Sequence, residues 1–119
     1  IIFTPDGLEY SGKIMHYDAG KRNSLQIHDK KVETGYLVSG ECNLLIENSE
    51  GEMETVKMEK GMGYTVKIGQ KHRYHAVTDC DIFESAMGET GMTYRLEDDY
   101  ARGDEDEEMR KEENRGWKG

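Results

Sequence analysis

The chain has 119 residues, which is enough for one domain with its own core and leaves little for a second. Hydrophobic and charged residues each make up 34% of it, so the core must be thin and the surface must carry much of the charge. Its 25 acidic and 16 basic residues leave a formal charge of −9, which repels phosphate backbones and anionic lipids and excludes nucleic acid and membrane surfaces as expected partners.

Short segments with alternating apolar and polar side chains run along most of the chain. Such a period of two is typical of strands with one face in a core. The predicted strands are 13–17, 24–28, 35–39, 43–47, 54–58, 63–66, 73–77, 81–87 and 92–96. Glycines and polar clusters between them indicate tight turns, and no long helix is predicted before residue 97. This pattern predicts an all-β fold, either a sandwich or a barrel.

The composition changes near the C-terminus. Acidic residues dominate 103–108, and a mixed basic and acidic run follows as far as Trp117. Such a run is usually solvated, as a short helix or a flexible segment, and it lacks the glycine and the spacing of a calcium-binding loop. We predict a folded barrel over residues 1–102 and a charged C-terminal tail over 103–119.

Two cysteines, Cys42 and Cys80, stand far apart and form neither a CxxC pair nor a zinc knuckle. We interpret both as small, partly buried thiols in a reducing compartment, which makes the cytoplasm the expected location. No stretch approaches the roughly 20 apolar residues that span a bilayer.

Four polar residues are spaced so that they could meet inside a barrel. Gln26 and His28 are two apart on one predicted strand, so their side chains share a face. Glu33 follows a short loop that lets the next strand return, and His72 opens a later strand whose side chains could enter the same interior. An amide oxygen, two imidazoles and a carboxylate suit Mn²⁺, Fe²⁺, Co²⁺, Ni²⁺ or Zn²⁺. We predict one divalent metal ion at these four residues, with its identity open.

The first of these segments resembles the first motif of the cupin superfamily, Gly-x5-His-x-His-x3–4-Glu-x6-Gly. Gly20, His28, Glu33 and Gly40 match it, and Gln26 stands in place of the first histidine. The resemblance implies a single cupin barrel, which is a double-stranded β-helix or jelly roll.

The second segment resembles the second cupin motif, Gly-x5-Pro-x-Gly-x2-His-x3-Asn. Gly61, Gly69 and His72 match, whereas Lys67 replaces the proline and Ala76 the asparagine. Without the proline, whose φ is fixed, we expect a less rigid turn before His72.

A narrower resemblance covers two further stretches. Residues 20–28, Gly-Lys-Arg-Asn-Ser-Leu-Gln-Ile-His, look like the Gly-x-Arg-x-Ser-Leu-Gln-x-His stretch of cupin-type (type II) mannose-6-phosphate isomerase domains, where the glutamine is expected at the metal. Residues 95–100, Arg-Leu-Glu-Asp-Asp-Tyr, resemble the ending of small stand-alone cupins grouped with those isomerases. The chain lacks the nucleotidyltransferase domain that often accompanies the isomerase domain.

The resemblance implies that the metal site binds or acts on a small sugar phosphate or a related polar metabolite. The metal would polarise the carbonyl while a base moves a proton between C1 and C2. Glu33 or a tyrosine could be that base. Arg22, Lys30, Lys71 and Arg73 are near the motifs in sequence and are the candidate phosphate-binding residues.

Two other functions stay open. His28, Glu33 and His72 form a two-histidine, one-carboxylate set of the kind that activates O₂ at Fe²⁺ in dioxygenases. The domain could also be a non-enzymatic, metal-dependent ligand-binding module. Because cupins commonly pair through edge strands and residues 1–4 are apolar and strand-like, we expect a homodimer.

Overall fold

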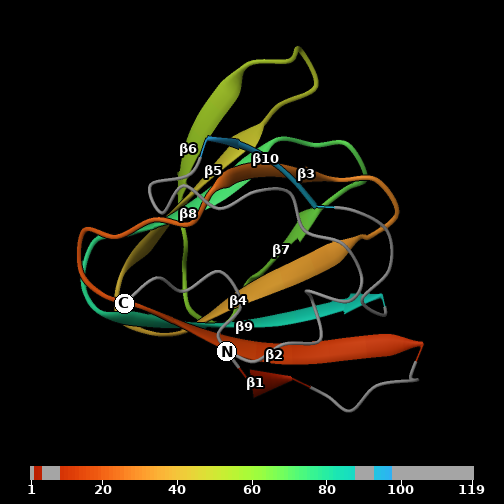
Figure 1. Cartoon of the computed structure of the whole chain (residues 1–119). Coiled ribbons are helices and arrows are strands. Elements are labelled where there is room, and N and C mark those ends of the chain that lie inside the picture. The colour runs from red at the N-terminus through yellow and green to blue at the C-terminus, as the bar shows by residue number, and fades with distance from the viewer. Residues whose placement is uncertain (1, 4–8, 88–92, 98–119) are drawn as a thin grey trace.

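The computed structural model describes residues 2–3, 9–87 and 93–97, and within them the chain forms strands and no helix (Figure 1). Sheet A has the strand order β1, β2, β9, β4, β7, with the bounds Ile2–Phe3, Tyr10–Tyr17, Cys80–Met87, Glu33–Ser39 and Gly63–Val66. Sheet B has the order β10, β3, β8, β5, β6, with the bounds Thr93–Glu97, Leu25–His28, His72–Ala76, Cys42–Glu47 and Met53–Lys57. All neighbouring strands are antiparallel.

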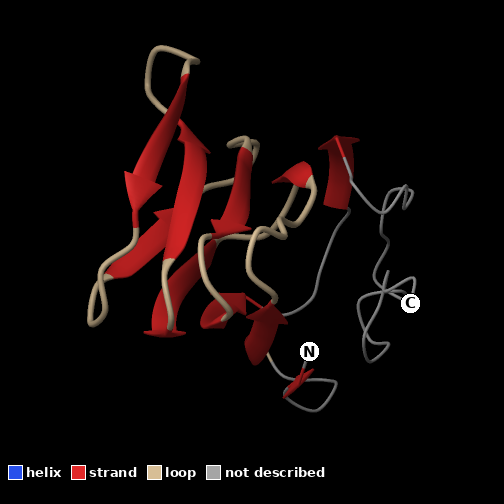
Figure 2. Ribbon diagram, turned by 90° about the vertical axis from the view of Figure 1, so that its left-hand side faces the viewer, coloured by secondary structure: helices blue, strands red, loops and turns tan. Residues whose placement is uncertain are grey.

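The chain passes repeatedly from one sheet to the other. β3, β4 and β5 each lie in the sheet opposite the preceding strand, and so do β7, β8, β9 and β10, whereas β2 and β6 stay in the sheet of their predecessors. Figure 2 shows the two layers from the side. This order is that of a jelly roll, so the predicted fold class is confirmed.

The predicted strands are close to the observed ones. β7 has the predicted bounds, whereas β2 begins at Tyr10 rather than at residue 13. Apolar residues 2–3 form β1 at the edge of sheet A, where they pair with β2. The predicted tail, 103–119, and its boundary with the barrel lie outside the described residues.

The interior between the sheets has an apolar half and a polar half. Alternation on β2 places Lys13 and Met15 inside, and alternation on β9 places Ile82 and Glu84 inside. The apolar half is a single cluster of buried side chains: Met15, Leu37, Cys42, Leu44, Met58, Tyr74, Ala76, Cys80 and Ile82. The polar half lies further along the same strands and holds the charged residues described below.

Both cysteines are free thiols in the apolar cluster, and they are more fully buried than predicted. Burial raises the pKa of Cys42 to about 12, and burial likewise raises the pKa of Cys80. Both thiols are therefore protonated at neutral pH and act as core side chains. Among the described residues, no helix is long and apolar enough to cross a membrane.

Candidate metal centre

Three of the predicted ligands come from three different strands. His28 ends β3, Glu33 begins β4 and His72 begins β8. The loop after His28 carries the chain from sheet B to sheet A, so Glu33 meets the histidines across the interior. β3 pairs with β8 with Gln26 opposite His72, and the N–H of Gly69 donates to the His28 carbonyl oxygen at 2.8 Å. The loops before Glu33 and His72 therefore lie at the same end of the barrel, which we call the site end.

The ligand atoms of these three side chains converge. Glu33 Oε1 is 3.1 Å from His28 Nε2 and 3.0 Å from His72 Nε2, and the three residues offer ligand atoms that all lie within 4.8 Å of one another. Two ligand atoms that bind one cation at about 2.1 Å and at right angles to each other are about 3.0 Å apart. The three side chains are buried, each with 2% exposure or less. Their spacing fits a single divalent cation.

A backbone contact orients the ring of His72. Its Nδ1 lies 3.0 Å from the carbonyl oxygen of Gln70, which can only accept, so Nδ1 carries the hydrogen. In the neutral ring Nε2 then presents a lone pair. This Nε2 is buried and makes no aligned hydrogen bond, although Glu33 lies close to it. Metal-binding histidines are commonly fixed through their second nitrogen in this way. The imidazole and carboxylate ligands suit a divalent first-row transition metal in the series from Mn²⁺ to Zn²⁺.

Glu33 uses its two oxygens differently. Oε1 faces both histidines, whereas Oε2 lies 3.3 Å from the ammonium nitrogen of Lys31, which is 1% exposed. Burial alone would raise the pKa of Glu33, but the Lys31 charge and the two histidines outweigh it and hold the pKa well below its usual range. Glu33 is therefore a carboxylate at neutral pH, as a metal ligand must be.

The pKa values of the two histidines shift in opposite directions, although Glu33 acts on both in the same sense. Burial lowers the pKa of His28 to about 4, because the favourable effect of Glu33 does not offset the desolvation. Burial also lowers the pKa of His72, but here the Glu33 carboxylate outweighs it and leaves the pKa above its usual value. His28 is therefore neutral at neutral pH, whereas a metal ion competes with a proton more strongly at His72 than at an ordinary histidine.

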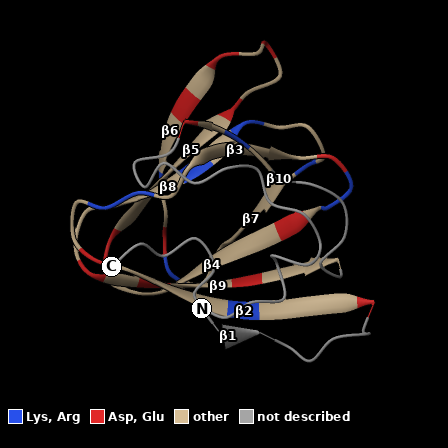
Figure 3. Cartoon of the chain, in the orientation of Figure 1, with Lys and Arg blue, Asp and Glu red and all other residues tan. Residues whose placement is uncertain are grey.

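A second buried ion pair lies beside the first. Lys13 on β2 and Glu84 on β9 are register partners, and Lys13 Nζ is 3.3 Å from Glu84 Oε1 with 5% and 3% exposure. Figure 3 shows the basic segment of β2 next to the acidic segment of β9. Burial, together with the neighbouring charge of Glu33, raises the pKa of Glu84 to about 7. Sequence reasoning missed Lys13, Lys31 and Glu84, although alternation with Met15 and Ile82 places Lys13 and Glu84 on the inward face.

Gln26, the predicted fourth ligand, lies next to the site on sheet B. It is half-buried, shares a face of β3 with His28 and is the register partner of His72. Its amide oxygen accepts a hydrogen bond of 2.7 Å from the hydroxyl of Ser24, which is fully buried. A carbonyl oxygen has two lone pairs, so this bond orients the amide and leaves one lone pair for a cation.

The four predicted phosphate-binding residues do not gather in one place. Lys30 and Lys71 are exposed and lie in the loops of the site end. Arg73 follows His72 directly, so it faces away from the interior, and its Nε donates to a backbone oxygen, that of Asn23, at 3.1 Å. Arg22 forms a backbone bridge with His75, three residues beyond His72.

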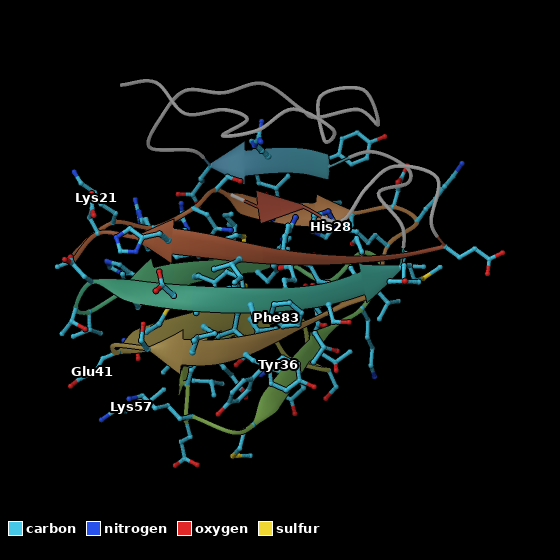
Figure 4. The ribbon with its side chains drawn as sticks, turned by 90° about the horizontal axis from the view of Figure 1, so that it is seen from below. Lys21, His28, Tyr36, Glu41, Lys57 and Phe83 are labelled. Carbon is cyan, nitrogen blue, oxygen red and sulfur yellow. The ribbon has the colours of Figure 1, made fainter. Side chains whose placement is uncertain are left out.

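In Figure 4, Lys21, which precedes Arg22 in the chain, lies toward the other end of the barrel from His28. Of the four predicted cations, Lys30 and Lys71 lie in the loops of the site end, Arg22 lies further away, and Arg73 is next to His72 but on the opposite face of β8.

Gln70 stabilises the turn that lacks the family's proline. Its side-chain oxygen accepts from the N–H of Lys67 at 2.9 Å, and its Nε2 donates to the carbonyl oxygen of Glu47 at 2.7 Å. Gly69 supplies a positive φ of 75° in the same turn. These contacts constrain the backbone before His72 in a way that the motif alone does not predict.

Comparisons with known proteins agree with this fold and site. A family described as "Cupin domain" matches residues 13–83, which is more than half of the chain. The chain therefore belongs to the cupin domain family, as the motifs predict. Comparison with curated protein sequences finds no match.

Solved structures of several cupins share the fold. An oxalate oxidase in complex with the substrate analogue glycolate aligns with a TM-score of 0.66 and 18% identity, over 74% of this chain and 46% of that chain. Oxalate decarboxylase from Bacillus subtilis aligns with a TM-score of 0.65 and 18% identity, over 74% and 24%. The coconut allergen cocosin aligns with a TM-score of 0.66 and 11% identity, over 74% and 24%. This chain spans less than half the length of each, and the likeness concerns the fold.

Replacing Glu33 by Gln tests the electrostatics of the site in metal-free protein. The variant keeps His72 buried but removes the carboxylate that raises its pKa, so we expect the His72 pKa to fall below its usual 6.5. The exposed His16, whose pKa is raised by Asp81, serves as an internal control and keeps its value. Titration of the imidazole nitrogens by NMR measures both. An unchanged His72 pKa would contradict the assigned contact.

Proposed function

We propose that this chain is a metal-dependent cupin domain that binds and acts on a small sugar phosphate or a related polar metabolite. Gln26, His28, Glu33 and His72 hold one divalent cation. The observation that carries the proposal is the convergence of Glu33 Oε1 with two histidine Nε2 atoms at 3.0 and 3.1 Å in a buried site. The type of metabolite follows from the resemblance of residues 20–28 to cupin-type mannose-6-phosphate isomerase domains.

A bound cation would polarise a carbonyl oxygen of the ligand. Glu33 is poorly suited to be the base that was predicted, because one of its oxygens faces the histidines and the other faces Lys31. Glu84 is the other carboxyl of the polar half, and it lies beside Glu33. We therefore assign proton transfer between neighbouring carbons to Glu84, and metal binding to Glu33.

The phosphate of such a ligand would lie at the site end of the barrel. Lys30 and Lys71 are exposed there, on the loops that the Gly69 to His28 hydrogen bond joins. Both ammonium groups can therefore reach a phosphate that remains in solvent while the sugar enters the site. Arg22 and Arg73 do not take part in this arrangement.

A turnover assay tests this function. Metal-loaded protein should interconvert mannose 6-phosphate and fructose 6-phosphate, followed by NMR, and Glu33→Gln should lower the rate by at least about a hundredfold because the cation loses a charged ligand. His75→Gln, a histidine on the opposite face of β8 from His72, should keep the rate. Binding without turnover would favour the non-enzymatic ligand-binding module. Neither binding nor turnover of either sugar phosphate would contradict the proposal.

A second candidate is an Fe²⁺-dependent dioxygenase. His28, Glu33 and His72 form the two-histidine, one-carboxylate set that leaves positions open for O₂ and substrate. The oxalate oxidase of similar fold supports oxidative chemistry on a small acid as the alternative. Oxygen consumption by the Fe²⁺-loaded protein and none by the Zn²⁺-loaded protein would favour this candidate over the isomerase. No consumption with a panel of small carboxylic and sugar acids would exclude those substrates.

We further propose a homodimer in the cytoplasm. The outer face of sheet A carries exposed Tyr10, Ile14, Tyr36 and Val38, and the ring of Tyr36 lies 6.3 Å from that of Phe83 (Figure 4). An apolar sheet face in a chain of net charge −9 supports contact with a second copy, because like-charged molecules meet most readily at an uncharged surface.

A further inference from the structure

A second polar cluster lies beside the candidate metal centre. Lys13 and Glu84 come from sheet A, and Tyr74 reaches toward them from β8 in sheet B. The Tyr74 hydroxyl occupies the space above Gly35, where any Cβ atom would collide with it. Gly35 is the register partner of Glu84, so the hydroxyl and the carboxyl are neighbours. We call Lys13, Tyr74 and Glu84 the second subsite.

Two polar atoms of this subsite lack hydrogen-bond partners in the described part of the chain. They are the hydroxyl oxygen of Tyr74, a residue with 1% exposure, and Oε1 of Glu84, with 2%. Lys13 lies 3.3 Å from that Oε1 as an ion pair but does not donate an aligned hydrogen bond to it. Buried polar groups are nearly always satisfied, so an unpaired donor beside an unpaired acceptor indicates a place for a third group.

The chemistry of the subsite selects the group that fits. Tyr74 and Lys13 are donors and Glu84 is an acceptor, and a hydroxyl can accept from the first two while it donates to the third. A carboxylate or phosphate oxygen would instead meet the carboxyl of Glu84. A wholly apolar group would leave the Tyr74 hydroxyl and Glu84 Oε1 without a hydrogen bond.

The subsite adjoins the metal centre closely enough for one small molecule to reach both. Gly35, the register partner of Glu84, lies two residues beyond Glu33 on β4, so the two buried carboxyls are on the same face of adjacent strands, one alternate position apart. We propose that the second subsite binds a hydroxyl of the ligand whose neighbouring oxygen binds the metal, so that the ligand is an α-hydroxy acid or an α-hydroxy carbonyl compound. This inference rests on the proposed metal site and gives the substrate class that the site accepts.

Glycolate and acetate are a matched pair of probes, because they differ only in the α-hydroxyl. With Zn²⁺-loaded protein, calorimetry or NMR titration gives both dissociation constants, and their ratio measures the preference for the hydroxyl. Chelation by the metal contributes to this ratio in every variant, so the informative quantity is its change on mutation. We expect Tyr74→Phe to reduce the preference about tenfold, which is the usual effect of one lost hydrogen bond in a buried site.

Tyr17→Phe is the matched control. Tyr17 is a neighbouring, partly buried tyrosine, with its ring 6.2 Å from that of Tyr74, and its hydroxyl donates to Met15 Sδ at 3.6 Å. This variant should keep the preference of the wild type. Zn²⁺ affinity, measured by competition with a chelator, should be unchanged in both variants.

The outcomes separate the two proposals. Failure of the wild type to bind Zn²⁺ would contradict the metal site itself. Normal Zn²⁺ binding with an equal glycolate preference in wild type and Tyr74→Phe would overturn the second subsite alone, and would assign its unpaired atoms to a buried water. An equal loss in Tyr17→Phe and Tyr74→Phe would also overturn it, since a general effect of core packing would then explain the change.

Discussion

A carboxylate buried to 2% exposure is the feature on which the rest of this structure depends. Glu33 has left water for the middle of a jelly roll, and an uncompensated charge there is strongly destabilising. Lys31 faces one oxygen and two histidines face the other. The protein thus keeps a negative charge in its interior, with a nitrogen of each histidine about 3 Å from the same carboxylate oxygen, and this arrangement fits a divalent cation.

The jelly roll makes this arrangement possible because its strands cross the barrel in alternate directions. β2, β4 and β9 in sheet A carry apolar side chains toward one end and charged ones toward the other. The apolar half, with Leu44 and Ile82 at its centre, supplies the burial that stabilises the fold. Because the ionic half shares the same strands, the core holds the charged side chains in position. Within each of the ion pairs Lys13–Glu84 and Lys31–Glu33, the two charges cancel. A bound divalent cation would therefore give the interior a net positive charge, which an oxygen-rich, anionic ligand can offset.

Much of the architecture is predictable from the sequence. The period-two pattern locates nearly every strand. Motif spacing groups His28, Glu33 and His72, and these residues on three strands do bring their ligand atoms within 4.8 Å of one another. Lys31 is harder to predict, since the conformation of a loop, not alternation, turns its ammonium inward. Lys13 and Glu84 sit at inward positions of their strands, yet charged residues are normally read as exposed. Their mutual pairing appears only when β2 and β9 are aligned.

Sequence proximity also misleads in one place. Arg73 adjoins His72 in the chain, but successive side chains of a strand point to opposite faces, so it is buried against the Asn23 backbone and not beside the ligands. The central claim is that His28, Glu33 and His72 hold one cation. Crystals grown with Mn²⁺ and measured by anomalous diffraction test it most directly. The account predicts one strong peak between the three side chains, within about 2.3 Å of Glu33 Oε1. No peak there, or a sole peak at the exposed group of His16, Asp18 and Asp79, would contradict it.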